Sequence, residues 1–317
     1  MNAKIIGIGA VAAILLTTGG AMADTFGTDG NQFMIDFVSI SGATNPTNGY
    51  GMVNSDYRMG TYEITNDQWN KFKASLGVPV TGSPLSAYDL DPYFTGTNVP
   101  TNNASWYEAA QFVNWLNTST GHQAAYRFTG APGTSDYTLA TWTTAEADNG
   151  TNFYRHKDAF YFLPTEDEWV KAAYWNGTGL QTYATKAGES LTQGNGTSGT
   201  GWNYYNNGYA TNPIGPWAVG SGSQELNGTY DMMGNVWEWM ENPYSDPNYG
   251  TDSIRGLRGG SYFFLYDYLA SSYRDYPSGS YVEYYQLGFR VASEVPEPTS
   301  LVLLTLGGLM VLKRKRK

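Results

Sequence analysis

The sequence contains no cysteine, and this absence excludes two kinds of chemistry. Disulfide bonds cannot staple the fold, so its stability depends on its own core. No side chain can serve as a redox thiol or as a soft thiolate ligand for a metal. Histidine is almost absent as well, because His122 and His156 are the only two copies and stand far apart in the chain. The sequence therefore offers few ligands for copper or iron.

Basic residues are scarce too, with 18 Lys and Arg against 28 Asp and Glu and a formal net charge of −10. Both ends of the chain are net basic, through Lys4 and through the block 313–317, so the body between them is more acidic still. Because binding to phosphates needs a positive surface, we expect no nucleic-acid partner. The acidic body is compatible with bound divalent cations.

Residues 1–23 have the pattern of a cleavable export signal. Lys4 precedes an apolar run over 5–16, and the small residues Ala21 and Ala23 follow it. A charged segment, an apolar segment and a small-residue cleavage site are the three parts of a signal peptide. We therefore expect export, with a mature chain that starts near Asp24.

Residues 295–317 have the pattern of a sorting tail. Pro296, Glu297 and Pro298 precede an apolar run over 301–312 and the basic block 313–317. The run is shorter than the ~20 apolar residues of a typical transmembrane helix, but the basic block would hold it at the cytoplasmic face. This combination resembles the PEP-CTERM signal, which implies transient membrane association and removal by a membrane exosortase. A plain C-terminal anchor is the alternative.

Three helices are expected between these ends, each starting with a capping box. In such a box a hydroxyl residue and an acid or amide three positions later satisfy free backbone N–H groups of the first turn. The three boxes are Thr65 with Gln68, Ser105 with Glu108, and Thr165 with Glu168. Gly77, Gly121 and Gly177 are expected to end the three helices as left-handed C-cap residues.

Short strands and long loops are expected elsewhere. Strand-like composition occurs over 33–38, 57–62 and 286–291, and stretches rich in glycine and asparagine, such as 194–208, separate the elements. No internal repeat and no proline- or serine-rich linker interrupts the body. One mixed α+β domain over 24–294 is the simplest organisation.

Six short blocks rich in aromatic, acidic and glycine residues follow one another along this domain. They are residues 62–66, 104–110, 162–169, 234–239, 258–262 and 288–290. In this order they resemble the sulfatase-modifying factor family, whose best known members are formylglycine-generating enzymes. The resemblance covers nearly all of the mature chain. It implies the C-type-lectin-like fold of those enzymes, with few helices, short antiparallel strands and many loops.

The chemistry of that family does not carry over to this chain. Formylglycine-generating enzymes oxidise a substrate cysteine with a copper ion and a cysteine pair that lies shortly after the Gly-Gly-Ser block. Residues 262–274 follow that block here and hold no thiol, so neither copper nor this oxidation is expected. A second branch of the family uses iron held by histidines, which His122 and His156 do not match in spacing. A diverged metal-dependent oxidoreductase stays as the alternative.

Calcium is the metal that the sequence favours. Asn235 and Glu238 place two hard oxygen ligands three residues apart, and backbone carbonyls lie between them. The resemblance implies structural calcium here, and a second calcium site at Asn203. The alternative is that these side chains satisfy backbone groups of a loop without metal. Glu238 also stands between two tryptophans, Trp237 and Trp239, as in some sugar sites, but a glycosidase is the less favoured interpretation.

Tyrosine recurs between residues 262 and 286 among serine, aspartate and glycine. Rigid amphipathic rings next to small polar residues are typical of adaptable binding surfaces. The resemblance extends to lectin-like variable proteins, in which the corresponding region forms the ligand surface. The candidate ligand-binding residues are Tyr262, Phe264, Tyr266, Tyr268, Tyr284 and Tyr285. The alternative is an aromatic-rich core.

Together these observations predict an exported, non-catalytic domain at the cell surface or in the extracellular matrix of a bacterium with an outer membrane. Its expected ligand is an extracellular glycan or a surface protein, its expected cofactor is structural calcium, and an exosortase is its expected processing partner.

Overall fold

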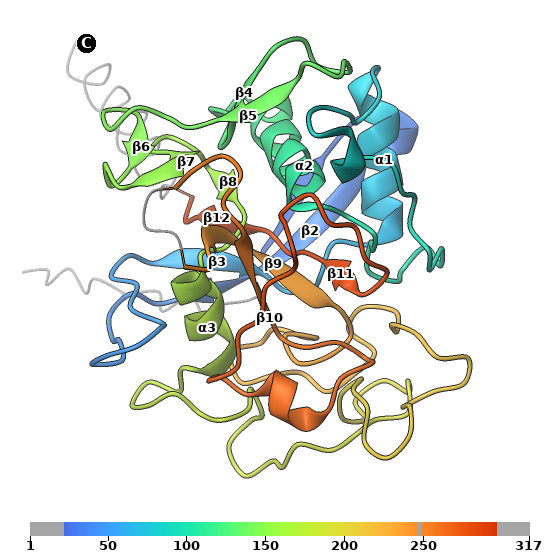
Figure 1. Ribbon diagram of the computed structural model, residues 1–317. Coiled ribbons are helices and arrows are strands. Elements are labelled where there is room, and N and C mark those ends of the chain that lie inside the picture. Colours follow the sequence, from blue (N-terminus) through green and yellow to red (C-terminus); the bar gives the residue numbers. More distant parts are fainter. Residues whose placement is uncertain (1–21, 246–248, 297–317) are drawn as a thin grey trace, which may run out of the picture.

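The computed structural model describes residues 22–245 and 249–296 of the chain (Figure 1). The expected signal peptide lies outside the described residues, except for Met22 and Ala23. Of the expected sorting motif, only Pro296 is described, and Glu297 and Pro298 lie outside. The capping and strand predictions for 24–294 can be compared with the structure directly.

A five-stranded antiparallel sheet joins the two ends of the described chain, in the order β1-β2-β3-β12-β8. Its strands are Met22–Phe26 (β1), Phe33–Ile40 (β2), Tyr57–Gly60 (β3), Tyr161–Phe162 (β8) and Ala292–Glu294 (β12). Phe33, Ile35 and Phe37 are buried, because alternate side chains of β2 point to the same face. The strands expected over 33–38 and 57–62 are thus confirmed as β2 and β3.

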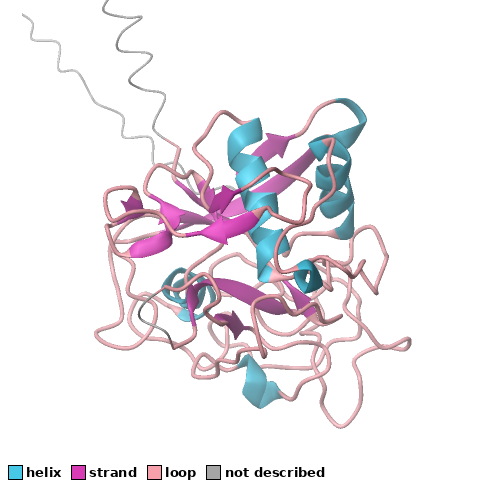
Figure 2. Cartoon of the chain, turned by 45° about the horizontal axis from the view of Figure 1, so that its top comes forward, coloured by secondary structure: helices cyan, strands magenta, loops and turns pink. Residues whose placement is uncertain are grey.

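Smaller sheets complete the strand structure. In a three-stranded sheet, the central strand pairs antiparallel with one neighbour and parallel with the other. Its strands are Trp237–Pro243 (β9, central), Arg255–Arg258 (β10, antiparallel) and Leu287–Gly288 (β11, parallel). Two hairpins are formed by Arg127–Thr129 (β4) with Thr138–Ala140 (β5), and by Ala147–Asp148 (β6) with Asn152–His156 (β7). Loops dominate the rest, above all residues 175–236 (Figure 2).

The described residues contain three α-helices, and all three predicted capping boxes are present. The helices are Asn66–Leu76 (α1), Trp106–Ser119 (α2) and Glu166–Tyr174 (α3). In each box the hydroxyl oxygen of the cap accepts an N–H from the third helical residue, whose side chain accepts the N–H of the cap in return. Short 3₁₀ turns lie at Asp29–Asn31 (η1), Leu85–Ala87 (η2) and Tyr266–Leu269 (η3).

The predicted helix ends are correct at one position and wrong at two. Gly77 is the left-handed C-cap of α1, with φ of 70°. Helix α2 ends earlier than expected because Thr120 caps it, its N–H bonding to the carbonyl of Asn117. Helix α3 ends at Tyr174 because Trp175 is extended and forms a bridge with Leu180. Gly121 and Gly177 therefore lie in the turns that follow, not at the caps.

The strand expected over 286–291 is also shorter than its alternating pattern suggested. Only Leu287–Gly288 pairs with β9, and the chain then turns inward, so that Arg290 reaches the buried carboxylate of Glu238. The buried ion pair replaces the expected continuation of the ladder. From Ala292 the chain joins the five-stranded sheet.

Helices α1 and α2 pack side by side (Figure 1). An aromatic cluster fills the space between them and the sheets. The rings of Phe72 and Phe112 meet edge to face with centroids 5.1 Å apart, and Phe112 meets Phe289 at 5.5 Å. All three are fully buried, and each such side chain stabilises the fold by about 1.5–3 kcal/mol relative to exposure. Helix α3 packs with β9 around Trp169 and Met240. An α+β fold with few helices and short strands, as expected, is confirmed.

No helix among residues 22–245 and 249–296 has the length and apolarity that a membrane crossing requires. The apolar run 301–312 lies outside these ranges. At the other end, β1 begins at Met22 and extends across the expected cleavage point. Asp24, the expected first mature residue, is held by Arg58 at 2.5 Å and by the hydroxyl of Tyr161 at 2.8 Å.

Candidate functional site

The tyrosine-rich segment 262–286 is anchored where it leaves β10. Gly259 and Gly260 have φ of 95° and 75°, a conformation that favours glycine, and a Cβ on Gly260 would come within 2.8 Å of the Leu269 side chain. The N–H of Tyr262 then donates to the carbonyl of Asn235 over 3.0 Å. This sharp turn sets the direction of the residues that follow.

The six predicted ligand-binding residues divide into two groups. Tyr266, Tyr284 and Tyr285 are exposed, at 45%, 48% and 42%. Tyr262 is buried, and Phe264 and Tyr268 are partly buried against the core, where Phe264 meets Trp237 at 5.4 Å. Three of the six residues are thus exposed, as a binding surface requires, and three belong to or pack against the aromatic core.

A chain of seven neighbouring rings runs through this part of the molecule, and its middle member, Tyr262, is buried. Neighbouring centroids along it are separated by 5.8 Å (Tyr285 to Tyr93), 4.9 Å (Tyr93 to Phe94), 5.7 Å (Phe94 to Tyr262), 6.3 Å (Tyr262 to Phe263), 5.6 Å (Phe263 to Tyr209) and 5.1 Å (Tyr209 to Tyr205). We call these seven residues the aromatic surface. Tyr93 and Phe263 are its most exposed members outside the predicted set, at 69% and 45%.

The loop that carries Tyr93 and Phe94 is fixed by one buried amide. The Oδ1 of Asn102 accepts the N–H groups of Tyr93 and Phe94 over 2.8 and 3.1 Å, and its Nδ2 donates to the carbonyls of Phe94 and Pro100, each over 3.0 Å. The Nδ2 of Asn66 donates to the carbonyl of Phe94 as well, over 2.6 Å. The backbone that carries these two rings is therefore fixed before any ligand arrives.

Sequence reasoning missed Tyr93, Phe94, Tyr205, Tyr209 and Phe263. The first four come from loops without periodicity, and the chain between them is long, so no local pattern connects them. Phe263 lies inside the predicted segment, but it is not a tyrosine and was passed over. A search for aromatic pairs in loops, such as Tyr93 with Phe94, is the one signal that could have found them.

Two of the three residues expected to bind calcium lie together. The Nδ2 of Asn203 donates to the Oδ1 of Asn235 over 3.1 Å, and this oxygen also accepts the N–H of Trp217 over 2.7 Å. The third, Glu238, is bound by Arg290 through both carboxylate oxygens, at 2.6 Å each. Because an ion pair already compensates its charge, Glu238 fits poorly as a calcium ligand in this arrangement. Calcium stays a prediction.

Several acids are buried around the same arginine. Glu63, Glu225, Asp231 and Glu238 are each at most 3% exposed. Burial raises the pKa of Glu225 to about 8 and that of Asp231 to about 6. Burial, and next the charge of Asp231, raises the pKa of Glu63 well above its usual value. Carboxyls closed off from solvent cannot reach a glycan, which argues against a glycosidase site at Glu238.

Each of the two histidine rings packs against one aromatic ring. His122 stacks on Phe160 with centroids 4.5 Å apart, and His156 meets Trp142 edge to face at 4.6 Å. Within the part of the chain that the structure describes, no three His, Cys, Asp or Glu side chains are spaced to hold a metal ion.

Solved structures with a similar fold include Treponema denticola variable protein 1 and CarF. Treponema denticola variable protein 1 aligns with a TM-score of 0.59 and 23% identity, covering 88% of this chain and 100% of its own. CarF aligns with a TM-score of 0.57 and 22% identity, covering 82% of this chain and 98% of its own. At these identities the likeness establishes the fold alone.

Two characterised relatives match by sequence. The chaperone protein LppX of Paenibacillus barcinonensis is 27% identical over 230 residues, covering 66% of this chain and 70% of its own length. Hercynine oxygenase of Mycobacterium tuberculosis is 31% identical over 141 residues, covering 36% of this chain and 28% of its own length.

Family membership follows from a family model that matches most of the chain. The model of the sulfatase-modifying factor enzyme 1-like domain matches residues 10–295, a span that contains all six sequence blocks and every described helix and strand. The chain therefore belongs to the sulfatase-modifying factor enzyme 1-like family.

Proposed function

We propose that the chain is an exported, non-catalytic binding protein of the cell surface or extracellular matrix, and that its aromatic surface holds an extracellular glycan. The exposed and partly exposed rings that flank the buried Tyr262, from Tyr285 to Tyr205, are the observation that carries this proposal. Flat ring faces pack on the apolar faces of sugars, and tyrosine hydroxyls add hydrogen bonds.

The fixed geometry of the surface supports binding. A tyrosine ring has only two side-chain torsions, so little entropy is lost when a ligand orders it. Asn102 and the buried Tyr262 hold the neighbouring rings from below. A ligand can therefore gain contact area without the entropic cost of ordering a loop.

Replacement of two exposed rings tests the proposal. The Tyr93→Ala/Tyr285→Ala variant removes one end of the aromatic surface, and its retention in affinity electrophoresis gels that contain the source bacterium's extracellular polysaccharide is compared with that of the unchanged protein. We expect binding to weaken about tenfold or more, because each lost ring contact at a binding centre costs on the order of 1–2 kcal/mol.

Tyr276→Ala is the matched control, since Tyr276 is 50% exposed and its ring packs on Tyr244, outside the aromatic surface. This variant should bind as the unchanged protein does. Equal retention of all three proteins would show that the assigned surface is wrong. If no protein is retained, but the double variant loses a protein partner at the cell surface, the ligand is a protein and not a glycan.

A diverged metal-dependent oxidoreductase is the second candidate, and the match to hercynine oxygenase is the observation in its favour. Elemental analysis of protein purified without chelator separates the two candidates. Stoichiometric copper or iron would support the enzyme, whereas calcium alone would support the binding protein and the expected structural site.

A further inference from the structure

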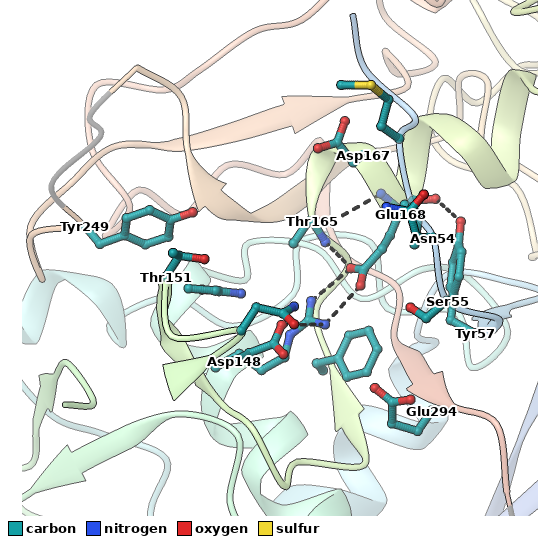
Figure 3. Close-up of a pocket in the computed structure, with 16 residues that line it drawn as sticks. Asn54, Ser55, Tyr57, Asp148, Thr151, Thr165, Asp167, Glu168, Tyr249 and Glu294 are labelled. Atoms are coloured by element: carbon teal, nitrogen blue, oxygen red, sulfur yellow. Dashed lines mark hydrogen bonds and ion pairs between the residues drawn. The ribbon is translucent and has the colours of Figure 1, made fainter. Parts of the chain in front are cut away.

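The loop between β2 and β3, residues 41–56, is fixed to one side of α3 (Figure 3). Near the start of the helix, the carboxylate of Asp167 accepts the N–H of Gly51 over 2.8 Å. At the end of the helix, the indole N–H of Trp175 donates to the hydroxyl of Thr44 over 3.1 Å. The loop is therefore held at both ends of α3.

Lys171 lies on α3 between these two contacts and reaches the same loop. Its Nζ donates to the side-chain carbonyl Oδ1 of Asn45 over 2.8 Å and to the backbone carbonyl of Val53 over 2.7 Å. Lys171 is 1% exposed, and within the described residues no carboxylate forms an ion pair with it. Burial lowers the pKa of this amine, since removal from water disfavours its charged form. Lys171 therefore loses its proton, and becomes a nucleophile, more readily than a solvated lysine.

The side-chain amide of Asn45 is oriented for attack by this amine. Its Oδ1 also accepts the N–H of Val53 over 2.8 Å, and such donors stabilise the negative charge that develops on a carbonyl oxygen when a nucleophile adds to the carbon. Because a C=O bond is about 1.23 Å long, this hydrogen bond leaves the Nζ of Lys171 about 3–4 Å from the amide carbon. The Nδ2 of Asn45 donates to the Oδ1 of Asn54 over 2.9 Å on the exposed side of the loop, where a leaving group can escape.

We propose that Lys171 and Asn45 form an isopeptide bond, an amide cross-link between two side chains, in the folded protein. The Nζ of neutral Lys171 bonds to the Cγ of Asn45, the bond between Cγ and Nδ2 breaks, and one amine proton moves to Nδ2, which leaves as ammonia. The step needs no oxidant, because the oxidation state of the carbon does not change. The bond ties the loop to α3 across 126 positions of the chain. It is a covalent staple that does not require cysteine, and it is independent of the aromatic surface.

A second lysine makes a similar contact without the burial. The Nζ of Lys186 donates to the side-chain carbonyl of Gln224 over 2.8 Å, but Lys186 is partly exposed. Contact with water keeps an ammonium group charged and therefore not nucleophilic. This pair should stay unlinked, which makes it a control within the same molecule.

Intact mass and peptide mapping of the whole protein test the proposal. We expect a mass lower by one ammonia than the value calculated from the sequence and its mapped ends, and a branched peptide that joins residues 45 and 171. Lys171→Arg keeps the positive charge, but its guanidinium stays protonated and does not attack the amide. This variant should lack both the mass deficit and the branched peptide, and it should unfold at a lower temperature than the unchanged protein.

The decisive observation is made on the unchanged protein, so it does not depend on how well the variant folds. Lys171 and Asn45 in separate peptides, with no branched product, would overturn the proposal. A mass deficit that persists in Lys171→Arg would also overturn it, because the ammonia would then be lost at another site. If the map joined Lys186 to Gln224 as well, the links would be an artefact of handling and the proposal would fail.

Discussion

Burial raises the pKa of Glu225 to about 8, because its carboxyl is fully enclosed and the partial compensation by Arg290 does not offset the lost hydration. Its oxygens accept N–H groups of Met232 and Met233 and the hydroxyl of Thr229. In the unfolded chain the same carboxyl would titrate near its ordinary value of about 4.3. At neutral pH this residue therefore carries a proton only when the protein is folded.

The buried Glu225 carboxyl makes the folded protein less stable as pH rises above neutrality. Between the unfolded and the folded pKa the native state binds the extra proton, so the free energy of unfolding falls as pH rises through this window. One such group contributes a slope of about 1.4 kcal/mol per pH unit. Asp231, with a pKa of about 6, has the same sign over a narrower range.

We predict that Glu225→Gln reduces the loss of stability between pH 6.5 and pH 8. Urea unfolding at several pH values measures the slope for both proteins, so the absolute stability of the variant does not matter. Some slope should remain, because burial also raises the pKa of Glu283 to about 7. An unchanged slope would mean that the Glu225 carboxyl is ionised in the folded protein.

At the scale of elements, the loop 93–102 shows how this fold orders a segment without helix or strand. One buried amide, Asn102, forms four hydrogen bonds with backbone groups of its own loop. Hydrogen-bonded backbone groups lose little when buried, whereas unpaired ones cost about 1–3 kcal/mol each. The position of Tyr93 and Phe94 therefore depends on Asn102, a buried side chain that is not itself part of the aromatic surface.

We predict that Asn102→Ala lowers the free energy of unfolding by about 1–3 kcal/mol and also weakens glycan binding at the aromatic surface. Denaturant titration measures the first effect, and affinity electrophoresis of the folded variant measures the second. Asn98→Ala, an exposed position in the same loop, is the control and should change neither. A variant that is destabilised yet binds normally would show that the loop does not need to be preordered.

At the scale of the whole molecule, Arg58 holds both Asp24 and Glu294, the expected ends of the mature domain. Asp24 is held by Arg58, and the backbone carbonyl of Glu294 accepts from the same guanidinium over 3.2 Å. Arg58 is buried and thus ties β1, the first strand of the described chain, to β12, the last. Cleavage near Asp24 and after β12 would leave these contacts intact.

We predict that the protein released by the source bacterium starts near Asp24 and ends shortly after Glu294. Intact-mass measurement of the secreted protein determines both ends, and a strain without exosortase is the comparison, in which the C-terminal basic block should be retained. A released protein that still carries residues 313–317 would rule out the proposed processing of the tail.

The sequence by itself determined the features that depend on residues close together in the chain. The capping boxes at Thr65, Ser105 and Thr165 were predictable because a helix start is decided within four residues. The family fold was predictable from the six ordered blocks, and the lack of cysteine decided the chemistry that the chain cannot perform. The strand-like composition of residues 33–38 located β2 in the same way.

Only the tertiary structure decided what depends on residues far apart in the chain. It paired Glu238, one of the expected calcium ligands, with Arg290 in a buried ion pair. It divided the tyrosine-rich segment into core and surface, and it brought Tyr93 and Tyr209 to that surface from distant loops. Burial and charge compensation are sums over all neighbours in space, so a local pattern cannot supply them.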